Sequence, residues 1–223
     1  MSLRALLLAV TCCALALGWT AHRATRQRDL IRSLAGGRSQ VYYDFQVTAD
    51  GALDPRRASP LPAWLVHSLG LDLWHDVAWI RLAGCEVTDA TLAAVARLPH
   101  VEELHLVETS VSEGGLAALA QMRGLKVLTL NTPEVGDALV AQLAELPELR
   151  ELEIFSALVT DRCVERLADC GTLERLWFED TEVTERALED FRVQHPNCRA
   201  GYSSPGFKTI AWRPRSLNAP SAN

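Results

Sequence analysis

Apolar residues recur along this chain with a period of 24 residues, from Val77 to about Pro196. Five consecutive rows align without gaps, and they begin at Val77, Val101, Leu125, Leu149 and Leu173. Columns 4, 6, 11, 16 and 19 are apolar in every row, and column 11 is Val in all five. A fixed period of this length indicates stacked structural repeats that share one continuous core.

Within each row the spacing changes from that of a strand to that of a helix. Apolar residues at columns 1, 4 and 6 predict a short strand, and those at columns 16 and 19 have helical spacing. Between them, column 12 is Ser or Thr in four rows, which suits a helix N-cap, and column 13 is always Asp or Glu. An acid in the first turn stabilises the positive end of a helix. We expect the third row to be the least regular, because it contains Pro133 and Gly136.

A single strand and helix cannot bury their own apolar faces, so such units stack into parallel strands on one side and helices on the other. The pattern LxxLxL followed by xVTDxxLxxLxxL resembles the leucine-rich repeat family, in its ribonuclease-inhibitor-like or cysteine-containing subclass. The resemblance covers just over half of the chain. It implies an α/β leucine-rich repeat solenoid with concave strands and convex helices. We expect five repeats and a terminal strand, which together form a repeat domain at residues 77–202.

The first 21 residues contain an uncharged run of 17 residues, Ala5 to Ala21. This length is at the short limit for crossing a bilayer. We predict an N-terminal membrane anchor (residues 1–21), followed by a basic juxtamembrane helix (residues 22–40). The arginines after the run favour a single-pass protein with its repeat domain in the cytoplasm. The alternative is a signal peptide, with export after cleavage.

Of the two regions that flank the repeats, the first is expected to be folded and the second is expected to be disordered. Residues 41–76 are predicted to form an N-terminal cap, with a strand at Val41–Phe45 and a helix at Pro62–Leu69. Trp64 and Trp74 are expected to pack on the first repeat. Residues 203–223 contain three Pro and four Ser without periodicity, and we expect a disordered tail.

The net charge of -6 hides two regions of opposite sign. Residues 77–200 have 22 acidic and 11 basic residues, whereas residues 1–40 have six Arg and one Asp. The acidic repeats argue against a nucleic-acid partner, although the column 13 acids are explained by helix starts. The six cysteines form no CxxC pair and read as small apolar residues. We therefore expect neither a metal nor another cofactor.

The concave face is the candidate site, because family relatives usually bind proteins there. Its candidate partner-binding residues come from columns 3, 5 and 7: Trp79, Arg81, Glu103, His105, Glu151, Glu153, Phe155, Arg175, Trp177 and Glu179. Phe155 and Trp177 among acids suit a basic or amphipathic protein segment. In the simpler interpretation, Trp177 merely covers Phe155.

An enzyme or a small-molecule substrate is not expected. Asp72, His75 and Asp76 lie close in sequence, but no nucleophile accompanies them. Glu151 and Glu153 would share one face of a strand, yet a shallow sheet offers no deep cleft for catalysis. Two hypotheses follow. The first is a membrane-tethered module that binds protein through its concave face, and the second is a membrane-associated scaffold whose concave face has no ligand.

Overall fold

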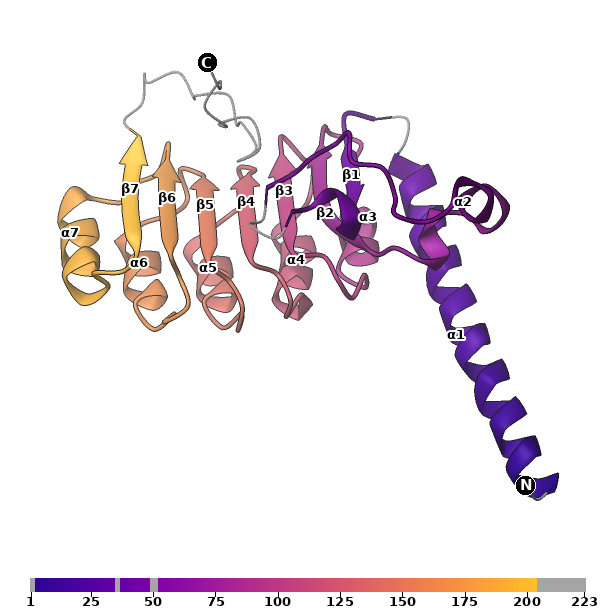
Figure 1. The fold of residues 1–223 in the computed structure, drawn as a ribbon. Helices are drawn as coiled ribbons and strands as arrows, with labels where there is room; N and C mark the ends of the chain where they lie inside the picture. The colour runs from indigo at the N-terminus through magenta and orange to yellow at the C-terminus, as the bar shows by residue number, and fades with distance from the viewer. Residues whose placement is uncertain (1–2, 35–36, 49–51, 204–223) are drawn as a thin grey trace, which may run out of the picture.

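The computed structural model describes residues 3–34, 37–48 and 52–203, and it consists of a row of strands with helices along one side (Figure 1). The strands form one seven-stranded sheet in the order β1 to β7. Their bounds are β1 Gln40–Tyr43, β2 Val77–Ala83, β3 Glu103–Val107, β4 Val127–Asn131, β5 Glu151–Phe155, β6 Arg175–Glu179 and β7 Arg199–Ser203. The α-helices are α1 Leu3–Leu34, α2 Ala63–Leu69, α3 Asp89–Val95, α4 Glu113–Leu116, α5 Asp137–Leu143, α6 Asp161–Leu167 and α7 Glu185–Gln194. The 3-10 helices are η1 Asp44–Gln46, η2 Leu71–Leu73 and η3 Ala117–Gln121.

The pairing of the strands follows the 24-residue repeat. Strands β2 to β7 are parallel, and each residue lies opposite the one 24 positions later, as Leu104 does opposite Leu128. Strand β1 is added at the N-terminal edge in the antiparallel sense, with Tyr42 opposite Trp79. The repeat alignment drawn from the sequence is therefore confirmed. This arrangement of stacked strand and helix units fits a leucine-rich repeat solenoid.

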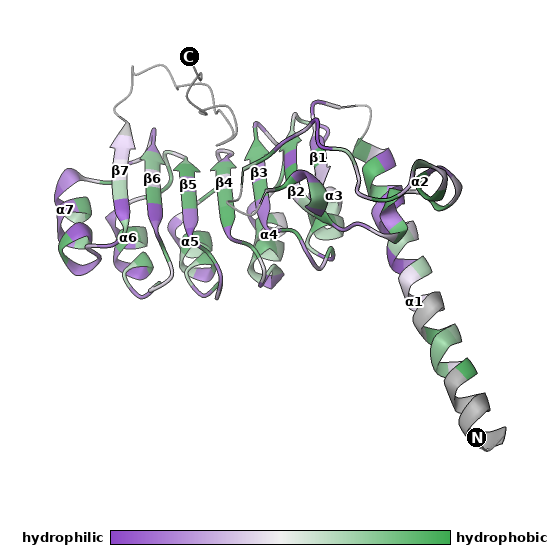
Figure 2. Cartoon of the chain, in the orientation of Figure 1, coloured by the Kyte–Doolittle hydropathy of each residue, from purple (hydrophilic) through white to green (hydrophobic). Residues whose placement is uncertain are grey.

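The core lies between the sheet and the convex helices (Figure 2). The apolar columns are buried in every row, and column 11 is represented in the core by all five of its valines. Cys163, Cys170 and Cys198 belong to the same core, as expected of small apolar side chains. Burial raises the pKa of the Cys163 thiol, and it raises the pKa of Cys198 to about 11. The Cys163 and Cys198 thiols are therefore neutral at ordinary pH.

Each of the helices α3 to α7 begins at the acid of column 13. In three rows this acid also reaches the N-cap of the next helix. Asp89 accepts hydrogen bonds from the backbone N–H of Ser112 at 2.7 Å and from its hydroxyl at 2.6 Å. Asp137 and Asp161 make the same two bonds, to Thr160 and Thr184 respectively. The acid therefore joins neighbouring repeats in addition to stabilising its own helix.

The second row is less regular than the third, contrary to the expectation from Pro133 and Gly136. Helix α5 of the third row has seven residues, whereas α4 of the second row has four and continues as η3. Gly114 and Gly115 explain this difference, because Gly is a poor helix former. Gly136 tolerates its position since an N-cap residue has extended backbone, here with φ -123° and ψ 174°.

Helix α1 covers the N-terminal end of the solenoid with its second half, which the sequence analysis assigned to a separate basic juxtamembrane helix. Leu30 and Leu34 belong to the repeat core. Gln27 is also buried, and its amide nitrogen donates to the carbonyl of His75 at 2.9 Å. The first half of α1 extends away from the repeats (Figure 1).

Trp64 and Trp74 do not pack on the first repeat. Trp64 is 69% exposed and Trp74 is 46% exposed. Helix α2, which contains Trp64, has no buried residue. The prediction was wrong because α1 already occupies the end of the core where these side chains were expected.

The membrane-spanning anchor expected near Ala5 to Ala21 is not supported. Among residues 3–34, 37–48 and 52–203, no helix is both long and apolar enough to cross a bilayer. The tail expected at residues 203–223 lies, apart from Ser203 at the end of β7, outside the described residues.

Candidate functional site

The concave face is formed by columns 3, 5 and 7, which alternate with the buried columns 4 and 6. Because successive side chains of a strand point to opposite faces, all ten candidate residues lie on this side of the sheet. The strand register places Glu151 opposite Arg175, Glu153 opposite Trp177 and Phe155 opposite Glu179. The structure therefore brings the C-terminal candidates together on two adjacent strands.

The N-terminal part of the concave face is closed. Trp79 is 1% exposed and His105 is 3% exposed. The ring of Tyr42, on β1, meets the Trp79 ring edge-on at a centroid distance of 5.2 Å, and the His105 ring lies 5.1 Å from it. Trp79 and His105 therefore offer little surface to a partner, although the sequence placed both in the binding set.

A chain of hydrogen bonds crosses β3, β4 and β5 on this face. Nε2 of His105 lies 2.7 Å from Oε1 of Glu103, and its Nδ1 lies 2.9 Å from the hydroxyl oxygen of Thr129. That hydroxyl donates to Oε2 of Glu153 at 3.2 Å. Because the Thr129 hydrogen is used at Glu153, both ring nitrogens of His105 face acceptors.

The C-terminal part of the face is more open, with Phe155 and Trp177 both half-buried. The Trp177 ring lies across Gly201, its neighbour on β7, so closely that a Cβ at that position would collide with the ring. Trp177 therefore leans toward the terminal strand, where only Gly leaves room for it. Its position is fixed by the sheet itself, and covering Phe155 is not needed to explain it.

The acids around the aromatic pair interact with the sheet. Glu151 lies 3.3 Å from the guanidinium of Arg175, and Glu153 accepts from Thr129. Glu179 is buried, opposite Phe155. Arg175 offsets part of the acidic charge, so this region is less acidic than the sequence alone indicates.

Large apolar side chains are also exposed at the N-terminal end of the molecule. Val10, Leu15 and Trp19 of α1 are exposed, as are Trp64 and Trp74. Farther along α1, two ion pairs attach the helix to the cap: Arg23 lies 2.9 Å from Asp76, and Arg28 lies 3.2 Å from Asp72.

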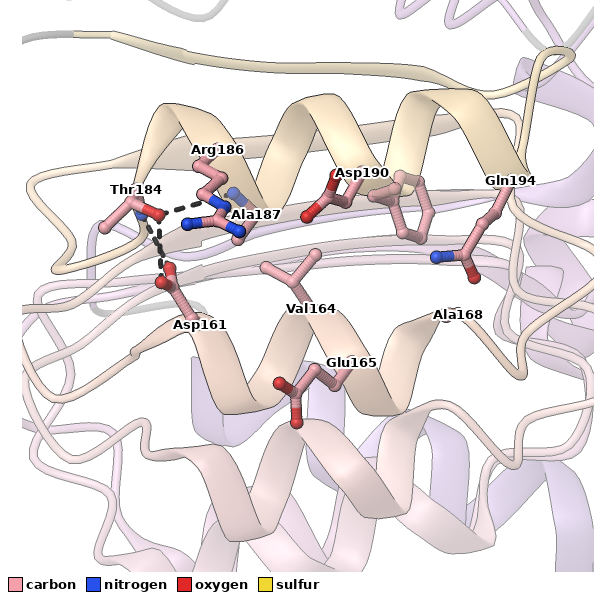
Figure 3. A pocket seen from close by; sticks show the side chains of 10 residues that line it. Asp161, Val164, Glu165, Ala168, Thr184, Arg186, Ala187, Asp190 and Gln194 are labelled. Atoms are coloured by element: carbon pink, nitrogen blue, oxygen red, sulfur yellow. Dashed lines mark hydrogen bonds between the residues drawn. The ribbon is translucent and has the colours of Figure 1, made fainter.

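A groove of about 460 Å³ separates α6 from α7 on the convex side (Figure 3). The bonds between Asp161 and Thr184 lie at one end of it, and Gln194 lies at the other. None of the concave-face candidates lines this groove. Over the described part of the chain, no group of three His, Cys, Asp or Glu is placed to hold a metal ion.

Sequence reasoning missed one constellation in the cap. It found no nucleophile beside His75, but the structure places Ser59 at one ring nitrogen of His75 and Asp44 at the other. The three residues are separated by 15 and 16 positions along the chain. Asp44 begins η1, whereas Ser59 and His75 lie outside helices and strands. No short motif could have revealed this grouping.

Comparisons with known proteins add little to this description. No protein-family model matches the chain, and no curated protein matches it. Among solved structures, internalin C2 of Listeria monocytogenes is similar at 20% identity and a TM-score of 0.39, over 50% of this chain and 46% of that one. A leucine-rich repeat protein of Leptospira interrogans is similar at 20% identity and a TM-score of 0.37, over 49% of this chain and 27% of that one. The chain thus spans less than half the length of either structure. Scores this low carry no argument, so the architecture rests on the chain's own repeat register.

Proposed function

We propose that the chain is a protein-interaction module that binds a segment of another protein on the concave face of β5, β6 and β7. The observation that carries this proposal is the half-buried Trp177 ring, which lies against the backbone of Gly201. A Trp whose position is already fixed loses little conformational entropy on binding, and Trp is enriched among residues that dominate binding energy.

The partner we propose is an amphipathic segment. An apolar side chain of the segment would stack on Trp177 and Phe155, and a Lys or Arg of the segment would approach Glu153. Arg175 beside Glu151 disfavours a uniformly basic partner, because a second cation there would meet like charge. Such a mixed arrangement provides specificity through charge placement.

A pair of matched variants tests this proposal. Trp177→Ala removes the concave ring, whereas Trp64→Ala removes a more exposed ring from α2, outside the concave face. We expect a captured partner to be lost with Trp177→Ala and retained with Trp64→Ala, each compared at equal folded concentration. Equal recovery by both variants would favour the alternative, a scaffold whose concave face has no ligand.

We also infer the ribonuclease-inhibitor-like subclass from the helix starts. Helices α3, α4, α6 and α7 each begin with a Ser or Thr N-cap followed by an acid. Every full repeat consists of one strand on the concave side and a helix on the convex side. Sequencing of related chains would test this inference, because the subclass requires the same two columns to persist in them.

A second proposal concerns location. We propose that the part of α1 that carries the exposed side chains Val10, Leu15 and Trp19 associates with a membrane and leaves the repeats on the cytoplasmic side. Support comes from exposed Leu15 and Trp19, and from the Arg residues that follow them, since basic residues favour anionic lipid surfaces. Flotation with vesicles of phosphatidylcholine and phosphatidylserine tests it. The full chain should float and a Leu15→Asp, Trp19→Asp variant should not; a wild-type chain that stays at the bottom contradicts the proposal.

A further inference from the structure

Three irregular segments of the cap meet at the side chain of His75. Its Nδ1 lies 2.8 Å from Oδ1 of Asp44, the first residue of η1. Its Nε2 lies 2.9 Å from the hydroxyl oxygen of Ser59, in the loop before α2. Serine, histidine and aspartate in this order of contact are the arrangement that activates a nucleophilic serine, and it is recognised by geometry rather than by order along the chain.

The hydrogen bonds determine which atom holds each proton. Oδ1 of Asp44 is a carboxylate acceptor that also receives the backbone N–H of Phe45 at 2.7 Å. Nδ1 of His75 therefore holds a hydrogen, and in a neutral ring Nε2 is then an acceptor. The Ser59 hydroxyl donates its hydrogen to Nε2, which is the direction that general-base activation requires.

Neighbouring groups hold the His75 ring in this position. The Phe45 ring meets it edge-on, with centroids 4.5 Å apart. The backbone carbonyl of His75 accepts from the buried Gln27 of α1 at 2.9 Å. His75 itself is buried, whereas Ser59 remains partly exposed and can be reached from solvent.

We propose that Ser59 is a nucleophile toward small carboxylic esters, with His75 as its general base and Asp44 as a positioning residue. This activity is separate from protein binding on the concave face. Ser59 Oγ bonds to the acyl carbon while the bond from that carbon to the leaving alcohol breaks. His75 takes the Ser59 proton and gives it to the alcohol. A water molecule, deprotonated by His75, then bonds to the acyl carbon while the bond from that carbon to Ser59 Oγ breaks. His75 returns the proton to Ser59, and the carboxylic acid is released.

A fluorophosphonate probe tests the nucleophile directly, because the serine oxygen displaces fluoride and leaves a stable adduct. The full-length folded chain is incubated with the probe, and the adduct is measured by intact mass and located by peptide mapping. We expect one adduct, on Ser59, that is absent from Ser59→Ala. Ser68→Ala, which removes an exposed hydroxyl of α2, should be labelled at the wild-type rate.

The two other residues are tested by rate. A general base contributes about 10²–10⁴-fold, so His75→Gln should slow labelling by about 100-fold or more. Asp44→Asn should slow it less, because Asp44 is half-exposed and solvent screens its charge. Asp44→Glu should recover part of the rate, which a merely structural contact would not require.

Two results would overturn the proposal. One is a wild-type chain, shown to be folded by its cooperative thermal unfolding, that labels no faster than Ser59→Ala. The other is an adduct that maps to a residue other than Ser59, an outcome that can be read even if Ser59→Ala fails to fold. With either result, the hydrogen bonds at His75 would have only a structural role, which is to connect the loops of the cap.

Discussion

The contact between the second and third repeats can be strengthened by two substitutions. Three other contacts between repeats have an Asp bonded to the Ser or Thr N-cap of the next helix. At the corresponding place here, the acid is Glu113 and the N-cap is Gly136. The backbone of Gly136, at φ -123° and ψ 174°, matches that of Thr160, at φ -122° and ψ -179°. No atom lies within 4 Å of a Cβ added to Gly136, so Gly136→Thr fits without strain.

The expected gain can be estimated for each change. Replacing Gly at a compatible position stabilises a protein by about 0.4–1 kcal/mol, mainly because the unfolded chain loses freedom. Glu113→Asp alone should change stability little, since it still has no hydroxyl to bond. Together, Glu113→Asp and Gly136→Thr should add a link worth about 0.5–1.5 kcal/mol. The pair should therefore stabilise the chain by about 1–2.5 kcal/mol.

A double-mutant cycle measured by urea unfolding separates this link from the individual effects. Each kcal/mol should raise the Tm by about 2–4 °C in a domain of this size. If the double variant gains no more than the sum of the single variants, within about 0.3 kcal/mol, the acid does not act between repeats as described. Our explanation of the conserved spacing of columns 12 and 13 within this chain would then be refuted.

Three further predictions follow from the same contacts. Leu30→Ala should destabilise the chain by about 2–5 kcal/mol in urea unfolding, because Leu30 is in the core. Leu15→Ala, at an exposed position of the same helix, should cost less than about 0.5 kcal/mol. Equal effects of the two substitutions would contradict the role of α1 as a cap. The hydrogen bonds from Ser112 lower the pKa of Asp89, so Asp89 contributes to folding stability above its unfolded pKa near 3.8, and this contribution is lost as the pH falls through the lower folded pKa. Asp89→Asn should therefore flatten the dependence of stability on pH at acid pH. An unchanged slope would contradict this role of Asp89. Gly201→Ala should displace the Trp177 ring, lower the free energy of unfolding by about 1–3 kcal/mol and shift the Trp fluorescence. An unshifted spectrum would show that the ring does not lie against β7.

The repeat region could be predicted closely because its period restricts every element in the same way. Strands β3 to β7 each span columns 3 to 7, and helices α3 to α7 each begin at column 13. A residue such as Leu128 has the same surroundings as Leu104 and Leu152, so one row predicts the next. The sequence pattern also correctly predicted that the column 13 acids lie at the helix starts, but it did not predict their hydrogen bonds to the following repeat.

The ends of the solenoid could not be predicted in this way, because they follow no period. Nothing in the arginines after Ala21 shows that the same helix turn buries Gln27 and Leu30 against the repeats. Once α1 occupies that end, Trp64 has no core position left. The closed part of the concave face has a similar cause, since the register of β1 alone places Tyr42 over Trp79.

Site-specific photo-crosslinking tests the proposed binding face most directly. A benzophenone side chain is placed at Phe155 on the concave face and, as a control, at Val193, which is 82% exposed on convex helix α7. We predict that the probe at Phe155 links to one defined peptide segment of a partner protein and that Trp177→Ala abolishes this link. The probe at Val193 should give no such product. Crosslinks of equal yield at both positions would contradict the concave face as the binding surface. A product from Phe155 that persists in Trp177→Ala would contradict Trp177 as the residue that anchors the partner.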